Sequence, residues 1–209
     1  MSGFGYRIAA DGHATRVDVK DALASDAALT WVHLSTTAEH AQAWLREEAG
    51  LADYVVDALT AAETRPRCEA FDHGAFLNLR GRSSEELQGS DPLASLRIWG
   101  VKGRVFSVTR KDLLAVATVE KEVQAGRMHD PGDLITAFAT AITADLDPEV
   151  ADLGDALDAC EEDLDPDKVF ELRRHVTRVR SAAINYRRFL SPQRQALETL
   201  AQLPGDWLD

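Results

Sequence analysis

The feature that most constrains the fold is a long alternation of apolar residues, spaced three and four apart, near the C-terminal end of the chain. It runs in two registers on either side of Asp165-Pro166. Spacing of this kind places apolar side chains on one face of a helix. The first register is Leu146, Val150, Leu153, Leu157, Cys160 and Leu164, and the second is Val169, Leu172, Val176, Val179, Ala183, Tyr186 and Leu190. Two such helices with a short connection are expected to form an antiparallel hairpin.

The two expected helices carry opposite charge. Every charged residue between positions 145 and 167 is acidic. Between positions 168 and 194, every charged residue except Glu171 is basic. This sorting favours pairing of the helices with each other, although most of the charges can also be explained as two solvated faces. The pairs expected across the hairpin are Asp147 with Arg180 and Glu161 with Arg173.

Composition excludes several classes of protein. The chain has 209 residues and a net charge of −12, which argues against nucleic acid as a partner because phosphate would be repelled. We expect no signal peptide, and no membrane span, because no apolar run approaches the length of about 18 residues that a spanning helix needs. Cys68 and Cys160 lie in different segments, which fits a reducing cytoplasm. Cys160 lies on the apolar seam and is expected in the core.

The first 130 residues mix strand and helix signals. Turn residues at Asp11-Gly12 and Lys102-Gly103 favour hairpins. Strands are expected at 4–9, 15–19, 30–34, 67–72, 75–82, 94–101 and 104–109. Helices are expected from a capping box at Thr36–Glu39 to Gly50, from Asp53 as the cap to Arg65-Pro66, and over 113–124. The order predicts an α/β (α+β) protein: an α/β/α sandwich with a mixed sheet in residues 1–130, and a long antiparallel helical hairpin in 131–209.

Enzyme chemistry has no support in the sequence. A phosphate-binding glycine loop, a zinc-protease motif and a nucleophile elbow are all absent, and the six histidines are scattered singly. We therefore expect a protein that is not an enzyme.

One pair of residues has the spacing of metal ligands. Glu171 and His175 stand one helical turn apart, a geometry that can chelate zinc. Two ligands do not complete a structural site, and such pairs also occur by chance. The acidic helix can also collect hard divalent cations weakly through its carboxylates; the alternative is a solvated face that the basic helix completes.

Two short motifs are more distinctive. The first is Glu63-Thr64-Arg65-Pro66-Arg67, at the exit of the second helix, and the second is Tyr186-Arg187-Arg188-Phe189-Leu190-Ser191-Pro192-Gln193-Arg194, at the end of the basic helix. With the acidic helix between them, they resemble the cytoplasmic domain of the CorA metal-ion transporter superfamily. Within it they look most like the zinc-transporter (ZntB) branch. In the first motif we expect Pro66 to fix the helix exit and its charged neighbours to pair. In the second we expect Tyr186, Arg187 and Arg188 to contact a neighbouring subunit or an anion.

The resemblance implies an α/β/α domain beside a pair of long helices, with copies of the protein arranged as a homopentameric funnel. It also implies a stalk and two transmembrane helices after Asp209. The chain is thus expected to be the cytoplasmic domain of an inner (plasma) membrane protein, cut before the stalk. It would meet the membrane only through the missing C-terminal segment. By itself the fragment is expected to be a monomer or weak dimer that needs no cofactor to fold.

The function that the resemblance implies is divalent-cation transport, with zinc as the transported or regulatory ion and an acidic vestibule that concentrates cations. Two alternatives remain open. A magnesium or cobalt transporter would differ mainly in its pore loop, which lies outside this sequence. A freestanding interaction module would use the hairpin to bind a partner helix.

Overall fold

Seven strands form one mixed sheet in the computed structural model, which describes residues 2–24, 26–35, 38–62, 65–71, 73–84, 92–162 and 169–203. The strands are β1 (Ser2–Ile8), β2 (Ala14–Val17), β3 (Leu29–Ser35), β4 (Arg67–Phe71), β5 (Gly74–Arg82), β6 (Leu93–Val101) and β7 (Arg104–Thr109). Their order is β2-β1-β3-β7-β6-β5-β4. Only the β3–β7 pair is parallel. Gly12 and Gly103 adopt positive φ in the predicted turns, a conformation that favours glycine.

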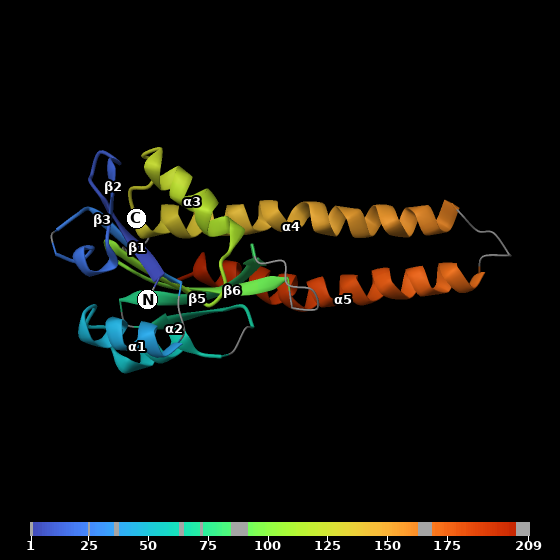
Figure 1. Ribbon diagram of the computed structural model, residues 1–209, viewed down its shortest axis with the longest axis horizontal. Helices are drawn as coiled ribbons and strands as arrows, with labels where there is room; N and C mark the ends of the chain where they lie inside the picture. Colours follow the sequence, from blue (N-terminus) through green and yellow to red (C-terminus); the bar gives the residue numbers. More distant parts are fainter. Residues whose placement is uncertain are drawn as a thin grey trace.

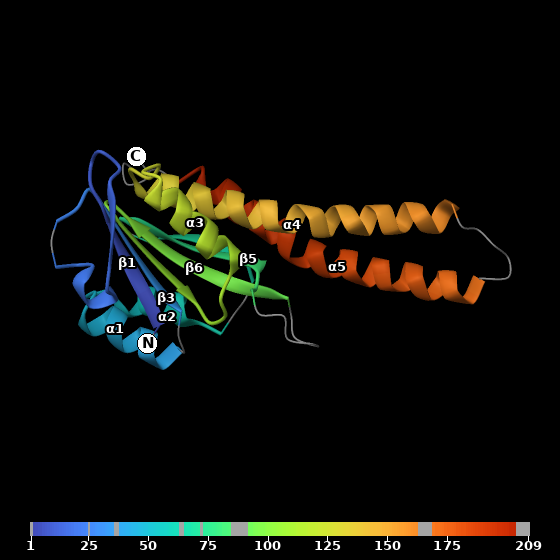
Figure 2. The same ribbon diagram turned by 45° about the horizontal axis from the view of Figure 1, so that its top comes forward.

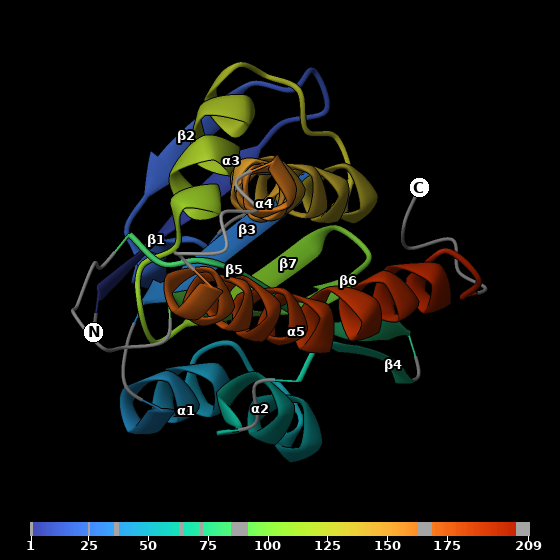
Figure 3. The same cartoon turned by 90° about the vertical axis from the view of Figure 1, so that its right-hand side faces the viewer.

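Helices cover both faces of the sheet, as Figures 1 and 3 show. They are the short 3-10 helix η1 (Val19–Asp21), α1 (Ala38–Glu47), α2 (Asp53–Thr60), α3 (Leu114–Gln124), α4 (Pro131–Glu162) and α5 (Val169–Leu200). Helices α1 and α2 lie on one face, and α3 with the first part of α4 lies on the other. The distal parts of α4 and α5 extend away from the sheet side by side (Figure 2). The predicted α/β/α sandwich with a long antiparallel hairpin is confirmed.

Two hydrophobic cores follow from the alternation of side chains along the strands. Leu77 and Leu79 of β5 belong to a core that includes Phe138 of α4. Phe76, which precedes Leu77 and lies on the opposite face of β5, belongs to the second core, which includes Val56 of α2. The sheet therefore separates the two helical layers.

The long hairpin is buried at one end only. In α4, the regularly spaced residues Leu134, Phe138, Ile142 and Leu146 are buried against the sheet. Beyond this point the seam opens, and Val150 is already 41% exposed. Helix α4 begins at Pro131, but its first half shares the core of the sheet. The division into two domains at residue 130 stays a prediction.

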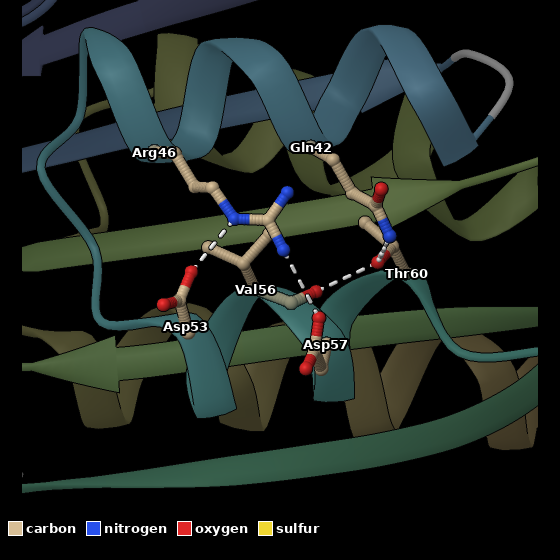
Figure 4. A network of polar contacts seen from close by, with 6 residues as sticks. All are labelled: Gln42, Arg46, Asp53, Val56, Asp57 and Thr60. Atoms are coloured by element: carbon tan, nitrogen blue, oxygen red, sulfur yellow. Dashed lines mark hydrogen bonds and ion pairs between the residues drawn. The ribbon is translucent and has the colours of Figure 1, made fainter.

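The start of α2 differs from expectation. The N-cap position is Ala52, and Asp53 is the first helical residue, so the prediction that Asp53 caps the helix is wrong. Asp53 instead forms a 2.8 Å ion pair with Arg46 of α1, and Asp57 forms a second ion pair with the same arginine at 3.2 Å (Figure 4). Close by, Gln42 Nε2 donates to Thr60 Oγ1. The proposed capping residue Thr36 lies outside the described residues.

Helix α5 closes an open edge of the sheet. Strand β4 pairs with β5 only as far as Asn78, so the backbone N–H of Arg80 has no strand partner on that side. The side chain of Gln193, which is buried in α5, accepts a 2.7 Å hydrogen bond from this N–H. One glutamine thus ties the end of the hairpin to β5, the strand next to the edge strand β4.

His33 is buried and held neutral at the centre of the sheet. Its Nδ1 lies 2.8 Å from Ser107 Oγ, which also accepts a 2.9 Å hydrogen bond from Trp31 Nε1. Burial lowers the pKa of His33 to about 4, although the charge of Asp112 acts in the opposite direction. His33 lies in β3, where the sequence predicted a strand at residues 30–34.

The lowered pKa of His33 predicts acid sensitivity. In the unfolded chain this imidazole binds a proton below pH about 6.5, which the folded protein excludes until about pH 4. Its contribution to stability is therefore complete above this window and falls by about 1.4 kcal/mol per pH unit as the pH drops through it. Urea unfolding between pH 7 and pH 4.5 should show a shallower loss in His33→Gln than in wild type. The exposed control His13→Gln should keep the wild-type slope, and equal slopes for all three would contradict the assignment.

The contact of Gln193 predicts a specific stability loss. Gln193→Ala leaves the buried N–H of Arg80 without its acceptor, which should cost about 1–3 kcal/mol in the free energy of unfolding. Gln195→Ala, at an exposed position of the same helix, serves as the matched control. Urea unfolding measures both. Equal midpoints for the two variants would show that the contact contributes nothing.

Candidate functional site

The distal parts of α4 and α5, which extend away from the sheet, are here called the distal arm. The two predicted metal ligands lie together in this arm. Glu171 and His175 of α5 line a cavity of about 470 Å³ with Cys160 of α4. The thiol of Cys160 donates to the carbonyl oxygen of Ala156 at 3.1 Å, and Arg178 Nη2 lies 3.4 Å from His175 Nδ1. Among the described residues, no group of three or more His, Cys, Asp or Glu side chains is placed to hold a metal ion. Metal binding by Glu171 and His175 stays a prediction.

Most of the predicted seam residues within the described parts of α4 and α5 face one another, whereas Leu164 lies outside these parts. They line a groove of about 680 Å³ between the helices, whose apolar lining residues include Val150, Leu153, Leu157, Val176, Val179, Ala183, Tyr186 and Leu190. The seam is open rather than tightly packed, because Val150 and Leu157 remain 41% and 42% exposed. The periodicity therefore predicted the facing surfaces correctly, but these surfaces do not form a closed core.

The charged flanks of the hairpin do not pair as expected. Within the described part of the chain, no ion pair joins Asp147 to Arg180 or Glu161 to Arg173, and all four residues are exposed. The prediction of these pairs is wrong. The distal arm consequently presents one acidic and one basic helix to its surroundings.

A polar network joins the two helices where they leave the sheet. Arg82, at the end of β5, forms a 3.0 Å ion pair with Glu149 of α4. Tyr186 of α5 donates a hydrogen bond to the other oxygen of Glu149 at 3.5 Å. Burial raises the pKa of nearby Asp145, and the charge of Arg82 partly opposes this shift. This network connects one strand and both long helices at the root of the arm.

Helix α2 ends at Thr60, so the prediction that it extends to Arg65-Pro66 is wrong, and the first motif instead leads into β4. Pro66 is buried, and the carbonyl oxygen of Arg65 accepts a 2.8 Å hydrogen bond from Asn78 Nδ2 of β5. Arg67 forms a 2.6 Å ion pair with Glu69, and its guanidinium lies 4.8 Å from the centre of the Phe76 ring. These contacts are structural. Glu63 and Thr64, the first residues of the motif, lie outside the described part of the chain.

The second motif divides between the helix interior and its surface. Tyr186 contacts Glu149, and Gln193 binds the backbone of β5. Arg194 is exposed and pairs with Glu198 at 2.8 Å. Arg187 and Arg188, the other arginines of the motif, are exposed. Pro192 lies inside α5.

Two buried arginines were not identified from the sequence. Arg80 of β5 and Arg97 of β6 are only 4% and 3% exposed. Arg80 Nη2 donates to the carbonyl oxygen of Leu93 at 2.7 Å, and its guanidinium lies 4.1 Å from the centre of the Phe189 ring. The available signal was the alternation of Phe76, Asn78 and Arg80 along one face of a strand.

No helix in the described residues combines the length and apolarity that crossing a membrane requires. Residues 26–209 match the family described as "CorA-like Mg2+ transporter protein".

Two relatives show the extent of the similarity. The Pseudomonas aeruginosa protein named "Divalent cation transporter CmaX" is 31% identical over 182 residues, which cover 85% of this chain and 54% of the relative. A Yersinia pseudotuberculosis protein named "Zinc transport protein ZntB" is 26% identical over 207 residues, which cover 99% of this chain and 63% of the relative. The chain thus spans between about half and two thirds of the length of these relatives.

The same relationship appears in solved structures. The full-length CmaX structure superposes with a TM-score of 0.79 at 28% identity, covering 99% of this chain and 65% of that one. The cytoplasmic domain of ZntB from Vibrio parahaemolyticus has the same fold, with a TM-score of 0.76 at 20% identity. The superposition covers 96% of this chain and 80% of that one. The resemblance drawn from the two motifs is confirmed. This chain belongs to the CorA-like Mg2+ transporter family, a family of transporters rather than enzymes.

Proposed function

We propose that this chain is the cytoplasmic part of a divalent-cation transporter in the inner (plasma) membrane, and that zinc is the ion transported. The observation that carries the proposal is similarity along nearly the whole chain to proteins named as zinc transporters. CmaX, at higher identity, is named only as a divalent-cation transporter. Magnesium or cobalt is the second candidate cargo, because the family description itself names Mg2+.

Electrostatics gives this part of the protein a role in transport. The net charge is −12, and the part of α4 from Asp147 to Glu161 carries only acidic charges, at exposed or half-buried positions. Carboxylates gathered on one helix attract cations and raise their local concentration, an effect that falls with ionic strength. The ions would be held loosely and pass on, rather than act as cofactors for folding.

Assembly belongs to the same proposal. In the whole protein we expect a homopentamer, with membrane contact through a segment that follows this chain. The chain of 209 residues alone should be a monomer or weak dimer. Nucleic acid is not an expected partner, because the surface is strongly acidic overall.

The first test concerns the cargo. The gene should continue past Asp209 into two apolar segments, and the encoded protein in liposomes should carry zinc faster than magnesium at equal concentrations. Flux is measured with ion-selective dyes, with empty liposomes as the control. A stop codon directly after Asp209 would favour the interaction module instead, and faster magnesium or cobalt flux would replace zinc as the cargo.

The second test concerns Glu171 and His175, for which we propose weak regulatory zinc binding. They line one cavity and stand one turn apart, although Arg174 and Arg178 at the same cavity oppose a cation. Calorimetric titration should show zinc binding more tightly than magnesium, weakened about tenfold or more in Glu171→Gln with His175→Ala. Asp158→Asn, an acidic change on α4, should leave zinc affinity unchanged. Equally weak binding of both metals would reduce the arm to an acidic surface without a site.

A further inference from the structure

The groove between the distal parts of α4 and α5 leaves a large apolar surface uncovered. It has a volume of about 680 Å³, and we call it the seam groove. Val150 and Leu157, two of its lining residues from α4, are 41% and 42% exposed. Ile184, one turn from the lining residues Arg180 and Arg187 of α5, is 49% exposed. Contiguous apolar surface of this kind on a folded protein marks a place where another surface packs.

The two flanks of the seam groove carry opposite charge. On the α5 side, Arg180 and Arg187 line the groove and are exposed. On the α4 side, Gly154 lines the groove, and Asp147 and Asp158 lie two turns before it and one turn after it. This spacing places both aspartates, which are exposed, on the same side of the helix as Gly154. The groove is therefore bordered by carboxylates along one helix and by guanidinium groups along the other.

The heights of these charges along the distal arm match. The hydrogen bond that joins the two helices at the root of the arm sets which of their residues are level. Counting residues along both helices from this contact puts Asp147 level with Arg187, and Asp158 within one turn of Arg180. Within the described part of the chain, neither of these pairs is joined by an ion pair. Opposite charges therefore stand at matching heights on the two sides of the groove.

This arrangement is complementary to itself. When two copies face each other with their grooves together, a two-fold axis parallel to the helices puts α4 of each copy against α5 of the other. Acidic flanks then meet basic flanks at matching heights, and the two grooves close on each other. A two-fold axis across the helices would instead put α4 against α4, where like charges repel. Gly154, which has no side chain, lets the facing helix approach closely.

We propose that the distal arm pairs with the distal arm of a second copy of this chain, groove to groove, to form a four-helix bundle. Asp147 and Asp158 of each copy would lie against Arg187 and Arg180 of the other, and residues such as Leu157 would be buried between them. The net charge of −12 on each copy opposes association, so the pair is weak.

The inference rests on the weak dimer proposed above for this chain, and it specifies the surface that forms the contact. The pair is complete with two copies, so it is separate from the ring of five expected for the whole protein. It does not depend on which cation the protein transports.

The first experiment measures the mass of the chain of 209 residues by sedimentation equilibrium. Between about 10 μM and about 1 mM, the mass should rise from one copy toward two, as expected for a weak complex. Leu157→Gln should weaken the pair about tenfold or more, because the leucine is lost from the interface once in each copy. Leu114→Gln, the same change at a 37% exposed leucine of α3, is the control and should leave the affinity unchanged.

The second experiment reverses the flanking charges. Arg180→Glu with Arg187→Glu makes both flanks acidic, and Asp147→Lys with Asp158→Lys makes both flanks basic. Each double variant alone should be a monomer, because like charges would face each other across the interface. Mixed in equal amounts, the two variants should form a pair, because each acidic flank then meets a basic one. Far-UV circular dichroism checks that each variant keeps the helix content of the wild type.

Three results would overturn the proposal. A monomer at every concentration would leave the seam groove to a different occupant, such as a helix of another protein, without affecting the proposed transport. A dimer whose affinity is unchanged in Leu157→Gln would have its interface on another surface. Folded charge-reversed variants that stay monomeric when mixed would show that the flanks do not direct the pairing.

Discussion

The structure depends on the packing of one end of a long helical hairpin against a seven-stranded sheet. The first half of α4 buries large apolar side chains on the sheet, and the last turns of α5 add Ala196 and Leu200 to the same core. Gln193 supplements this packing by satisfying the β5 backbone where β4 ends. The apolar contacts supply most of the stabilisation, and the hydrogen bond fixes the position of α5 along the edge of β5.

Beyond this root, burial of apolar side chains stabilises the hairpin much less. The seam is half-exposed and opens into a groove, so each residue added to the arm gains little from burial. The charges of the arm are exposed and sorted by helix, and each is weakly coupled to its neighbours in water. The arm therefore gains much less stability from its own packing than the root does.

Sequence patterns predicted the secondary structure closely, because turn residues and side-chain alternation mark the ends of strands directly. They also predicted which faces of α4 and α5 are opposed. They could not predict how tightly these faces pack, since periodicity gives the direction of a side chain but not the distance between helices. The ion pairs expected for Asp147 and Glu161 failed for this reason. Arg80 and Arg97 were missed because a charged residue in a strand is ordinarily assigned to solvent. Gln193 was identified as part of a motif, but its contact was not predicted because its partner is a backbone N–H.

Hydrogen exchange along α4 and α5 tests the central claim that the hairpin is anchored at its root and loosely packed beyond it. The amides of residues 134–146 and 193–200 should be protected to nearly the same extent as the central strands. Those of residues 150–159 and 172–183 should exchange much faster, because the arm can open without global unfolding. Uniform protection along both helices would contradict the account, since it would mean that the arm unfolds only together with the sheet.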